Sequence, residues 1–138
     1  MSEQEIAVID KIRIEYNLKI EEACFSKGYI PRYIILDKSR NIHSYIVPCY
    51  ISGKKLISSY WMNLRFEETI LQFLKIQYSH LDRPLFFAYI YQNNIMIIEG
   101  DDVKNYLCNE KSPDLLMDYM IENSYDFSET FKLIKQEL

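Results

Sequence analysis

The sequence predicts an α+β protein in which helices pack on a mixed or antiparallel sheet. Three observations lead to this prediction. The chain of 138 residues has the usual length of one domain. Its apolar residues alternate between helical spacing and strand-like runs. The predicted elements follow the order helix, three-strand meander, helix, two strands and C-terminal helices, which is typical of a single α+β domain over residues 1–138.

The N-terminal segment fits a helix, with a strand as the alternative for part of it. Ser2 and Glu5 have the spacing of a capping box, which predicts that a helix begins there. Apolar residues then continue along one helical face, and Gly28 is suited to end a helix. Residues 11–20 also alternate between polar and apolar types, which is typical of a strand. We favour one long helix, with or without a kink, and keep the strand as the alternative.

Three strands are predicted to form the meander. Residues 29–37, 42–51 and 56–64 are rich in β-branched and aromatic side chains, and polar turns separate them. Pro48 lies within the second of these segments, and proline lacks the N–H group that a sheet ladder needs. The proline therefore predicts that this strand lies at an edge or contains a bulge.

The second half of the chain predicts a helix, two buried strands and further helices. Asn63 is a candidate N-cap for an amphipathic helix over residues 64–81. Residues 85–91 and 94–99 are nearly continuous apolar runs joined across Gln92, Asn93 and Asn94, which predicts strands at the centre of a sheet. C-terminal helices are expected around residues 102–109, 113–122 and 127–137.

An acidic junction follows the second of these strands. Asp101 is placed to cap a helix, and Asp102 falls in the first turn, where its charge favours the helix dipole. A cation site would require Glu99 to converge with further carboxylates, such as Asp37 or Asp82. The helix-cap interpretation explains the junction without a ligand, so no metal site is predicted.

The residues that most often perform catalysis show no recognisable spacing. Cys24, Cys49 and Cys108 lack Cys-x-x-Cys spacing, which predicts reduced and largely buried thiols. His43 and His80 lie beside serines without the arrangement of a catalytic triad, and Cys49 paired with either histidine is the alternative. The three glycines are too far apart for a phosphate-binding loop. We therefore expect no cofactor and favour a function that is not enzymatic.

The sequence also predicts a soluble cytoplasmic protein. Its first residues are acidic and lack the basic region of a secretory signal. The longest apolar runs are far shorter than the ~20 residues that cross a bilayer. No association with a membrane is therefore expected.

Charge is unevenly distributed along the chain. Residues 27–65 carry seven lysines and arginines against one acid, whereas the segments on either side are acidic and the whole chain has a net charge of −4. Tyrosine and arginine are enriched in protein interfaces, as is tryptophan. We expect the basic segment to bind a partner, and the expected contact residues are Arg32, Lys38, Arg40, Tyr45, Lys54, Lys55, Tyr60 and Trp61.

The leading hypothesis is a non-catalytic protein that binds another macromolecule, most simply another protein, as an inhibitor, immunity protein or adaptor. A competing surface is the acidic C-terminal region, with Asp114, Asp118, Glu122, Asp126 and Glu129, which suits a basic partner or imitates nucleic acid. An alternative function is nucleic-acid binding by residues 27–65, because basic groups contact phosphates and aromatic rings stack on bases. A second alternative is a metal-dependent hydrolase that uses Asp37, Asp82, Glu99 and Asp101.

The order of helix, three-strand meander, helix and strand resembles the core of the restriction-endonuclease-like family. The resemblance implies an Asp near one strand and a Glu/Asp-x-Lys motif on the next, which together hold a divalent metal. Asp37 fits the first requirement, but residues 56–64 contain no Glu, Asp or Lys. Asp102 and Lys104 have the motif's spacing but belong to a predicted helix. The resemblance therefore implies an inactive version that only binds.

Overall fold

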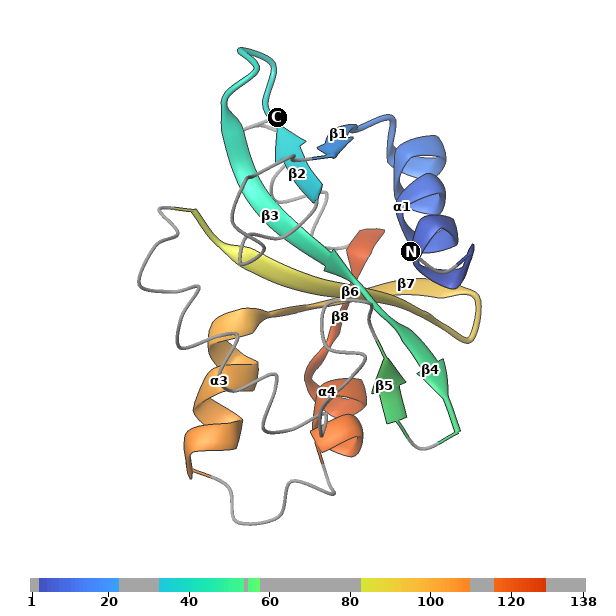
Figure 1. Cartoon of the computed structure of the whole chain (residues 1–138), viewed down its shortest axis with the longest axis vertical. Helices are drawn as coiled ribbons and strands as arrows, with labels where there is room; N and C mark the ends of the chain where they lie inside the picture. The colour runs from blue at the N-terminus through green and yellow to red at the C-terminus, as the bar shows by residue number, and fades with distance from the viewer. Residues whose placement is uncertain (1–2, 23–32, 54, 58–82, 110–115, 129–138) are drawn as a thin grey trace.

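The computed structural model of the chain describes residues 3–22, 33–53, 55–57, 83–109 and 116–128 (Figure 1). The elements in these ranges are α1 (Glu3–Tyr16), β1 (Lys19–Glu22), β2 (Tyr33–Leu36), β3 (Ile42–Pro48), β4 (Tyr50–Ser52), β5 (Lys55–Ile57), β6 (Leu85–Tyr91), β7 (Asn94–Glu99), α3 (Gly100–Asn109), α4 (Leu116–Asn123) and β8 (Tyr125–Asp126). The helix α1 precedes the sheet, and α3 and α4 follow β7, so the predicted α+β class is confirmed.

Six of the strands form one mixed sheet in the order β1-β2-β3-β6-β7-β8. The strands β1, β2 and β3 are an antiparallel meander, β6 runs parallel to β3, and β7 and β8 are again antiparallel to their neighbours. The predicted central position of residues 85–91 is confirmed, because β6 lies between β3 and β7. The strands β4 and β5 form a separate two-stranded sheet around Gly53, which has a positive φ of 63°.

The predicted long N-terminal helix is wrong after Tyr16. Asn17 adopts a positive φ of 51°, and asparagine is one of the few residues besides glycine that tolerates this conformation. The helix therefore ends, and the chain enters β1 at Lys19. The strand alternative is correct for the last part of the ambiguous segment, where Ile20 is buried between exposed neighbours.

The position of the meander also differs from the prediction. Its three strands are β1, β2 and β3. Of the third predicted strand, residues 56–64, only the first two residues are described, and they belong to β5, which pairs with β4 outside the main sheet. The predicted helix over residues 64–81 lies outside the described residues.

Pro48 does not mark an edge strand, because β3 lies between β2 and β6 and Pro48 is its last residue. The N–H group of Tyr45 donates to the carbonyl oxygen of Pro84, just before β6, and that of Cys49 to the carbonyl oxygen of Ala88 in β6, at 2.8 Å each. Backbone groups alternate along a strand, so the nitrogen of Pro48 faces away from β6. The described part of β2 begins opposite Ile46, so the missing N–H removes no described ladder bond.

The hairpin of β6 and β7 agrees with the predicted pair of strands. Tyr91 pairs with Asn94, and the two residues between them, Gln92 and Asn93, both have positive φ values of 50° and 66°. Two residues of positive φ define the type I′ turn that matches the twist of a hairpin.

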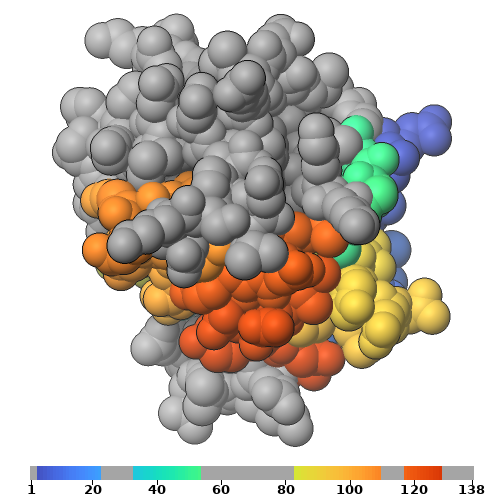
Figure 2. Space-filling model, turned by 90° about the horizontal axis from the view of Figure 1, so that it is seen from below, coloured from blue at the N-terminus to red at the C-terminus, as the bar shows by residue number. Residues whose placement is uncertain are grey.

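Both faces of the sheet carry a hydrophobic core. One core contains Val8, Ile9 and Ile12 of α1 together with Ile46 of β3 and Ala88 of β6. The other places α3 and α4 against the opposite side chains of β3, β6 and β7. Figure 2 shows α3 and α4 side by side on the surface, and Figure 1 shows α1 on the other side of the sheet. No helix in the described ranges is long and apolar enough to cross a membrane.

A polar contact and a ring stack hold α4 in place. The hydroxyl of Tyr89 in β6 donates to the carbonyl oxygen of Met120 at 3.2 Å and lies 2.6 Å from the hydroxyl of Ser124. Tyr119 of α4 stacks on Tyr106 of α3 with ring centroids 4.2 Å apart. Burial raises the pKa of Tyr89, so its hydroxyl keeps the proton that the hydrogen bond to Met120 requires.

The type I′ turn provides a test of the hairpin. Replacing Asn93 by Gly is expected to raise the free energy of unfolding by about 0.5–1 kcal/mol, because glycine adopts a positive φ without strain. Asn94→Gly is the matched control, since Asn94 lies in β7 outside the positive-φ positions. It should lower stability by about 0.5–1 kcal/mol. Urea unfolding measures both, and equal effects from the two variants would contradict the turn assignment.

Candidate partner-binding surface

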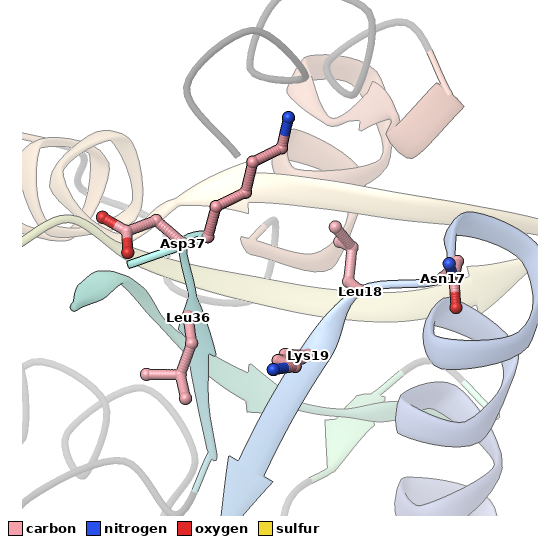
Figure 3. Close-up of a pocket in the computed structure, with 6 residues that line it drawn as sticks. Asn17, Leu18, Lys19, Leu36 and Asp37 are labelled. Carbon is pink, nitrogen blue, oxygen red and sulfur yellow. The ribbon is translucent and has the colours of Figure 1, made fainter. Parts of the chain in front are cut away.

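A pocket of about 310 Å³ lies between the turn from α1 to β1 and the turn from β2 to β3. Three of its residues lie where the chain enters β1 and three where it leaves β2, and they are Asn17, Leu18, Lys19, Leu36, Asp37 and Lys38. Figure 3 shows Asn17, Leu18 and Lys19 on one side of the pocket, with Leu36 and Asp37 on the other. The pocket therefore combines two leucines with three charged side chains.

The end of α1 carries an exposed apolar side chain, three residues before the first residue of the pocket. Ile14 is 81% exposed, the highest value among the large hydrophobic residues of the described chain. It precedes Asn17 by three residues, which is less than one helical turn of ~5.4 Å. The pocket, Ile14 and Arg40 together are called the corner surface below.

Asp37 determines the shape of the turn on the other side. Its Oδ1 atom accepts hydrogen bonds from the N–H groups of Ser39 and Asn41, both at 2.9 Å. The Arg40 N–H also donates to the carbonyl oxygen of Asp37 at 3.0 Å, and Arg40 has a positive φ of 65°. An aspartate side chain that bonds backbone groups a few residues later is a common way to form a turn. Lys38 and Arg40 are consequently exposed at its tip.

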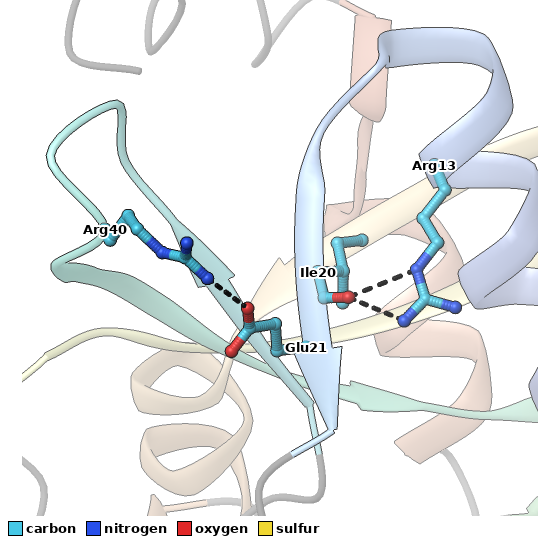
Figure 4. A network of polar contacts seen from close by, with 4 residues as sticks. All are labelled: Arg13, Ile20, Glu21 and Arg40. Atoms are coloured by element: carbon cyan, nitrogen blue, oxygen red, sulfur yellow. Dashed lines mark hydrogen bonds and ion pairs between the residues drawn. The ribbon is translucent and has the colours of Figure 1, made fainter.

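An ion pair links this turn to β1. The Nη2 atom of Arg40 lies 3.3 Å from the carboxylate of Glu21, and these side chains are 68% and 50% exposed (Figure 4). Such an exposed pair contributes only about 0–1 kcal/mol to stability. The pair has a larger effect on the electrostatic potential of the surface, because it neutralises Arg40, one of the two basic residues at the tip of the turn.

A second arginine holds α1 against β1. Arg13 donates from Nε and Nη2 to the carbonyl oxygen of Ile20, at 3.2 and 2.6 Å (Figure 4). Its Nη1 atom also lies 3.5 Å from the carboxylate of Asp10, one turn earlier in the helix. These contacts fix the angle at which the chain leaves α1 and thus the position of the pocket wall.

The structure brings only part of the predicted contact set together. Lys38 and Arg40 share the corner surface, whereas Lys55 lies in β5, at the opposite end of β3 (Figure 1). Tyr45 is buried in the core with 6% of its surface exposed, so its side chain does not contribute to a surface. The other four residues, Arg32, Lys54, Tyr60 and Trp61, lie outside the described ranges. The grouping as a whole stays a prediction.

The reasoning from sequence missed Ile14, Leu18 and Leu36. A signal was available for the first of these. The buried residues of α1 include Val8, Ile9 and Ile12, and Ile14 is displaced from that face by the helical period. An isoleucine off the apolar face of an amphipathic helix indicates a side chain that the fold itself does not bury.

The acidic junction is structured as a helix start, two residues earlier than predicted. Since α3 begins at Gly100, the cap position falls on Glu99, and Asp101 and Asp102 both lie in the first turn. Partial burial raises the pKa of Glu99, and the charges of Asp102 and Asp101 raise it further. In the described ranges no three His, Cys, Asp or Glu side chains are close enough together to hold a metal ion. Asp82 is not among the described residues.

The competing acidic surface is described in part. Asp118 and Glu122 are exposed one turn apart on α4. The Oδ1 atom of Asp126 instead accepts hydrogen bonds from the N–H and hydroxyl groups of Ser128, at 2.9 and 2.7 Å. Asp114 and Glu129 lie outside the described ranges.

The thiol and imidazole groups occupy structural positions. Cys49 is fully buried, and burial together with the charge of Glu5 raises the pKa of its thiol well above the ordinary value. The thiol donates to the carbonyl oxygen of Val47 at 3.6 Å, while Nδ1 of His43 lies 3.2 Å from the hydroxyl of Ser44. Cys108 is exposed, contrary to the prediction of largely buried cysteines. Cys24 and His80 are not described.

No protein-family model matches this chain, and no curated protein sequence matches it significantly. The interpretation of the corner surface therefore depends on the geometry of this chain alone.

Asp37 supplies a test of the turn that forms the pocket. Asp37→Ala removes the acceptor of two backbone N–H groups and should lower the free energy of unfolding by about 1–2 kcal/mol. Asp37→Asn retains the Oδ1 acceptor and should lose less than half of that. Lys38→Ala is the control and should be nearly neutral. Urea unfolding decides, and an equal loss for Asn and Ala would mean that the charge matters rather than the hydrogen bonds.

Thiol reactivity tests the buried position of Cys49. In the folded protein at pH 8, iodoacetamide should label Cys108 and leave Cys49 unlabelled, because the thiolate is the reactive form and burial disfavours it. In urea both should react. Mass spectrometry of the peptides measures each site separately. Labelling of Cys49 as fast as Cys108 in the folded state would contradict this assignment.

Proposed function

We propose that this chain is a non-catalytic protein that binds another protein, as an inhibitor, immunity protein or adaptor, and that the corner surface makes the contact. The observation that carries the proposal is the combination of the exposed Ile14 with a pocket that contains leucines and a charged rim. Protein interfaces combine an apolar centre with a polar rim in the same way.

The size of the pocket agrees with this proposal. Its volume of about 310 Å³ is at the lower end of the ~300–1,000 Å³ that is typical of small-molecule sites. A pocket of this size is large enough to accept one side chain of a partner protein. Leu18 and Leu36 supply apolar contact for such a side chain, and Lys19 and Lys38 are available for its polar neighbours.

The charge of the corner surface favours a protein over a nucleic acid. Arg40 is paired with Glu21, and Asp37 lies beside Lys38. Nucleic-acid binding depends on cationic groups that neutralise phosphates, and acids among them weaken that field. Binding of DNA or RNA by residues 27–65 is therefore the second candidate, supported by the exposed Lys38 and Arg40.

The positions of the reactive groups support a function without catalysis. Asp37 uses one carboxylate oxygen to form its turn, which leaves the hydrolase hypothesis only the other oxygen of this side chain for a metal ion. The Cys49 thiol is buried and its pKa is raised, which is the opposite of an activated nucleophile.

Partner capture tests the proposal. The immobilised chain should retain one stoichiometric protein from an extract of its native cell. Ile14→Glu and Lys38→Glu should each reduce capture about tenfold, which corresponds to ~1.4 kcal/mol. Ile6→Glu is the matched control, because Ile6 is also exposed but lies eight residues earlier in α1, about 12 Å along the helix. Unchanged capture by Ile14→Glu and Lys38→Glu would remove the corner surface from the interface.

A salt series distinguishes nucleic-acid binding, the second candidate function, from protein binding. The purified chain is mixed with single- and double-stranded DNA and RNA at low salt, and binding is followed as salt is raised. No binding is expected. Binding that weakens steeply with salt would overturn the proposal in favour of a nucleic-acid partner.

A further inference from the structure

A second pocket, of about 250 Å³, lies beside the start of α1. Three of its residues come from α1, three from the junction of β3 and β4 and one from β6, and they are Gln4, Ala7, Val8, Cys49, Tyr50, Ile51 and Ile90. The corner surface lies at the other end of α1, and a helix of 14 residues is ~21 Å long. This pocket, called the helix-start pocket below, is therefore a separate site.

The course of the chain after β3 explains why there is space here. The strand β3 pairs with β6 as far as Pro48 and Ala88, and the N–H group of Cys49 still donates to the carbonyl oxygen of Ala88. Tyr50 then begins β4, which pairs with β5 outside the main sheet (Figure 1). Ile90 of β6 consequently lies past the last residue that pairs with β3.

The helix-start pocket lies where the two hydrophobic cores meet. Val8 and Ile90 belong to the core on the side of α1. Cys49 and Ile51 belong to the core on the side of α3 and α4. Farther along β6 the pair of β3 and β6 separates these cores, and beyond Pro48 that separation ends.

The lining extends from the core to the surface. Val8 and Cys49 form its deep end, with exposures of 1% and 0%. Ile51 and Ile90 are half-buried, and Ala7 is exposed on α1. A molecule that enters beside Ala7 therefore contacts progressively more buried apolar side chains.

The chemistry of the lining selects a neutral ligand. None of the seven described residues that line the pocket is charged, in contrast to the three charged residues of the corner pocket. Gln4 and Tyr50 are its polar members, so an amide and a hydroxyl group are available for one polar atom. Glu5 is close enough to raise the pKa of the Cys49 thiol, but it is fully buried and does not line the pocket. A charged ligand would lose its hydration here without gaining a charged partner.

The volume limits the size of the ligand. A dry apolar cavity of ~150 Å³ is enough to bind benzene. The helix-start pocket is larger, at about 250 Å³, but smaller than the ~300–1,000 Å³ of sites for drug-sized molecules. It is therefore suited to one substituted ring or two fused rings.

We propose that the helix-start pocket binds a neutral, largely apolar small molecule of one or two rings. The proposal does not rest on the proposed function, because the two pockets lie at opposite ends of α1. A side chain of a partner protein is the competing occupant. The burial of the lining favours the small molecule, because a protein interface surrounds its pockets with exposed apolar surface, whereas Ile51 and Ile90 are themselves half-buried.

Indole is a suitable probe, since it is neutral, has two fused rings and carries one N–H donor. It is titrated into the full chain labelled with ¹³C at isoleucine methyl groups, and the methyl resonances are followed by NMR. Those of Ile51 and Ile90 should shift and saturate with a dissociation constant of about 1 mM or lower. That of Ile14 should stay unchanged, because Ile14 lies near the other end of α1.

A variant that fills the pocket tests the site. Ala7→Trp places a large ring in the space of the probe and should weaken indole binding at least about tenfold. Ala7 is exposed, so the variant is expected to fold. Ile6→Trp is the matched control, because Ile6 is an exposed neighbour in α1 that does not line the pocket, and it should leave binding unchanged.

A set of ligands of one size tests the requirement for neutrality. Benzyl alcohol should shift the same two methyl groups as indole. Benzoate and benzylammonium have nearly the same size but carry a charge, and each should bind at least about tenfold more weakly than benzyl alcohol.

The outcomes decide the proposal. Shifts of Ile51 and Ile90 that fail to saturate with either neutral probe would overturn it, as would equal weakening by Ale7-independent and pocket-filling changes, that is, by Ile6→Trp and Ala7→Trp. Charged ligands that bind as tightly as benzyl alcohol would also reject it. If Ala7→Trp does not fold, Ala7→Leu provides the same comparison. Methyl groups that ignore both neutral probes but respond to a captured partner protein would assign the pocket to a protein interface instead.

Discussion

The parallel pairing of β3 with β6 is the constraint on which the rest of the structure depends. Val47 and Phe87 lie opposite each other in this pair, and both are fully buried. Because side chains alternate across a strand, the same two strands supply both cores: Ile46 and Ala88 contact the side of α1, and Val47 and Phe87 contact the side of α3 and α4. A change in this register would expose both sets at once, so the layers on the two faces are positioned by one pair of strands.

The corner surface lies at the margin of the sheet, away from the central pair of β3 and β6. The strand β1 is three places from β6 in the sheet order, and its neighbours are a helix end and a tight turn. Asn17 and Arg40, both with positive φ, direct the chain at these two turns, and Leu18 and Leu36 face the pocket between them. Leu36 is largely buried and Leu18 packs against the core of α1, whereas Ile14 at the end of α1 is exposed. The exposure of Ile14 points to contact with another molecule, and the nearby ion pair and Arg13 contact keep the margin in one arrangement.

Much of the local structure was predictable from the sequence. The hairpin of β6 and β7 was expected because its apolar runs and its Gln92–Asn93 turn lie within fifteen residues of one another, where periodicity and turn preference act directly. The end of α1 was harder, because residues 11–20 satisfy both the helical and the strand period, and the positive φ of Asn17 decides between them. The edge position predicted from Pro48 was wrong for a related reason. The effect of a missing N–H depends on which neighbouring strand it would face, and the pairing of β3 with β6 determines this.

The sequence by itself determined the α+β class, the N-terminal helix, the buried hairpin and the helix that starts at the acidic junction, because each depends on residues that are near neighbours in the chain. Only the tertiary structure decided the parallel neighbour of β3, the edge position of β1 and the corner surface. Glu21 and Arg40 are nineteen residues apart, and the pocket joins residues 17–19 to residues 36–38. Contacts of this kind arise from packing between segments whose sequence patterns are independent of each other. No local pattern could therefore predict the contact of Arg13 with Ile20, or the ion pair that neutralises Arg40 with Glu21 of another strand.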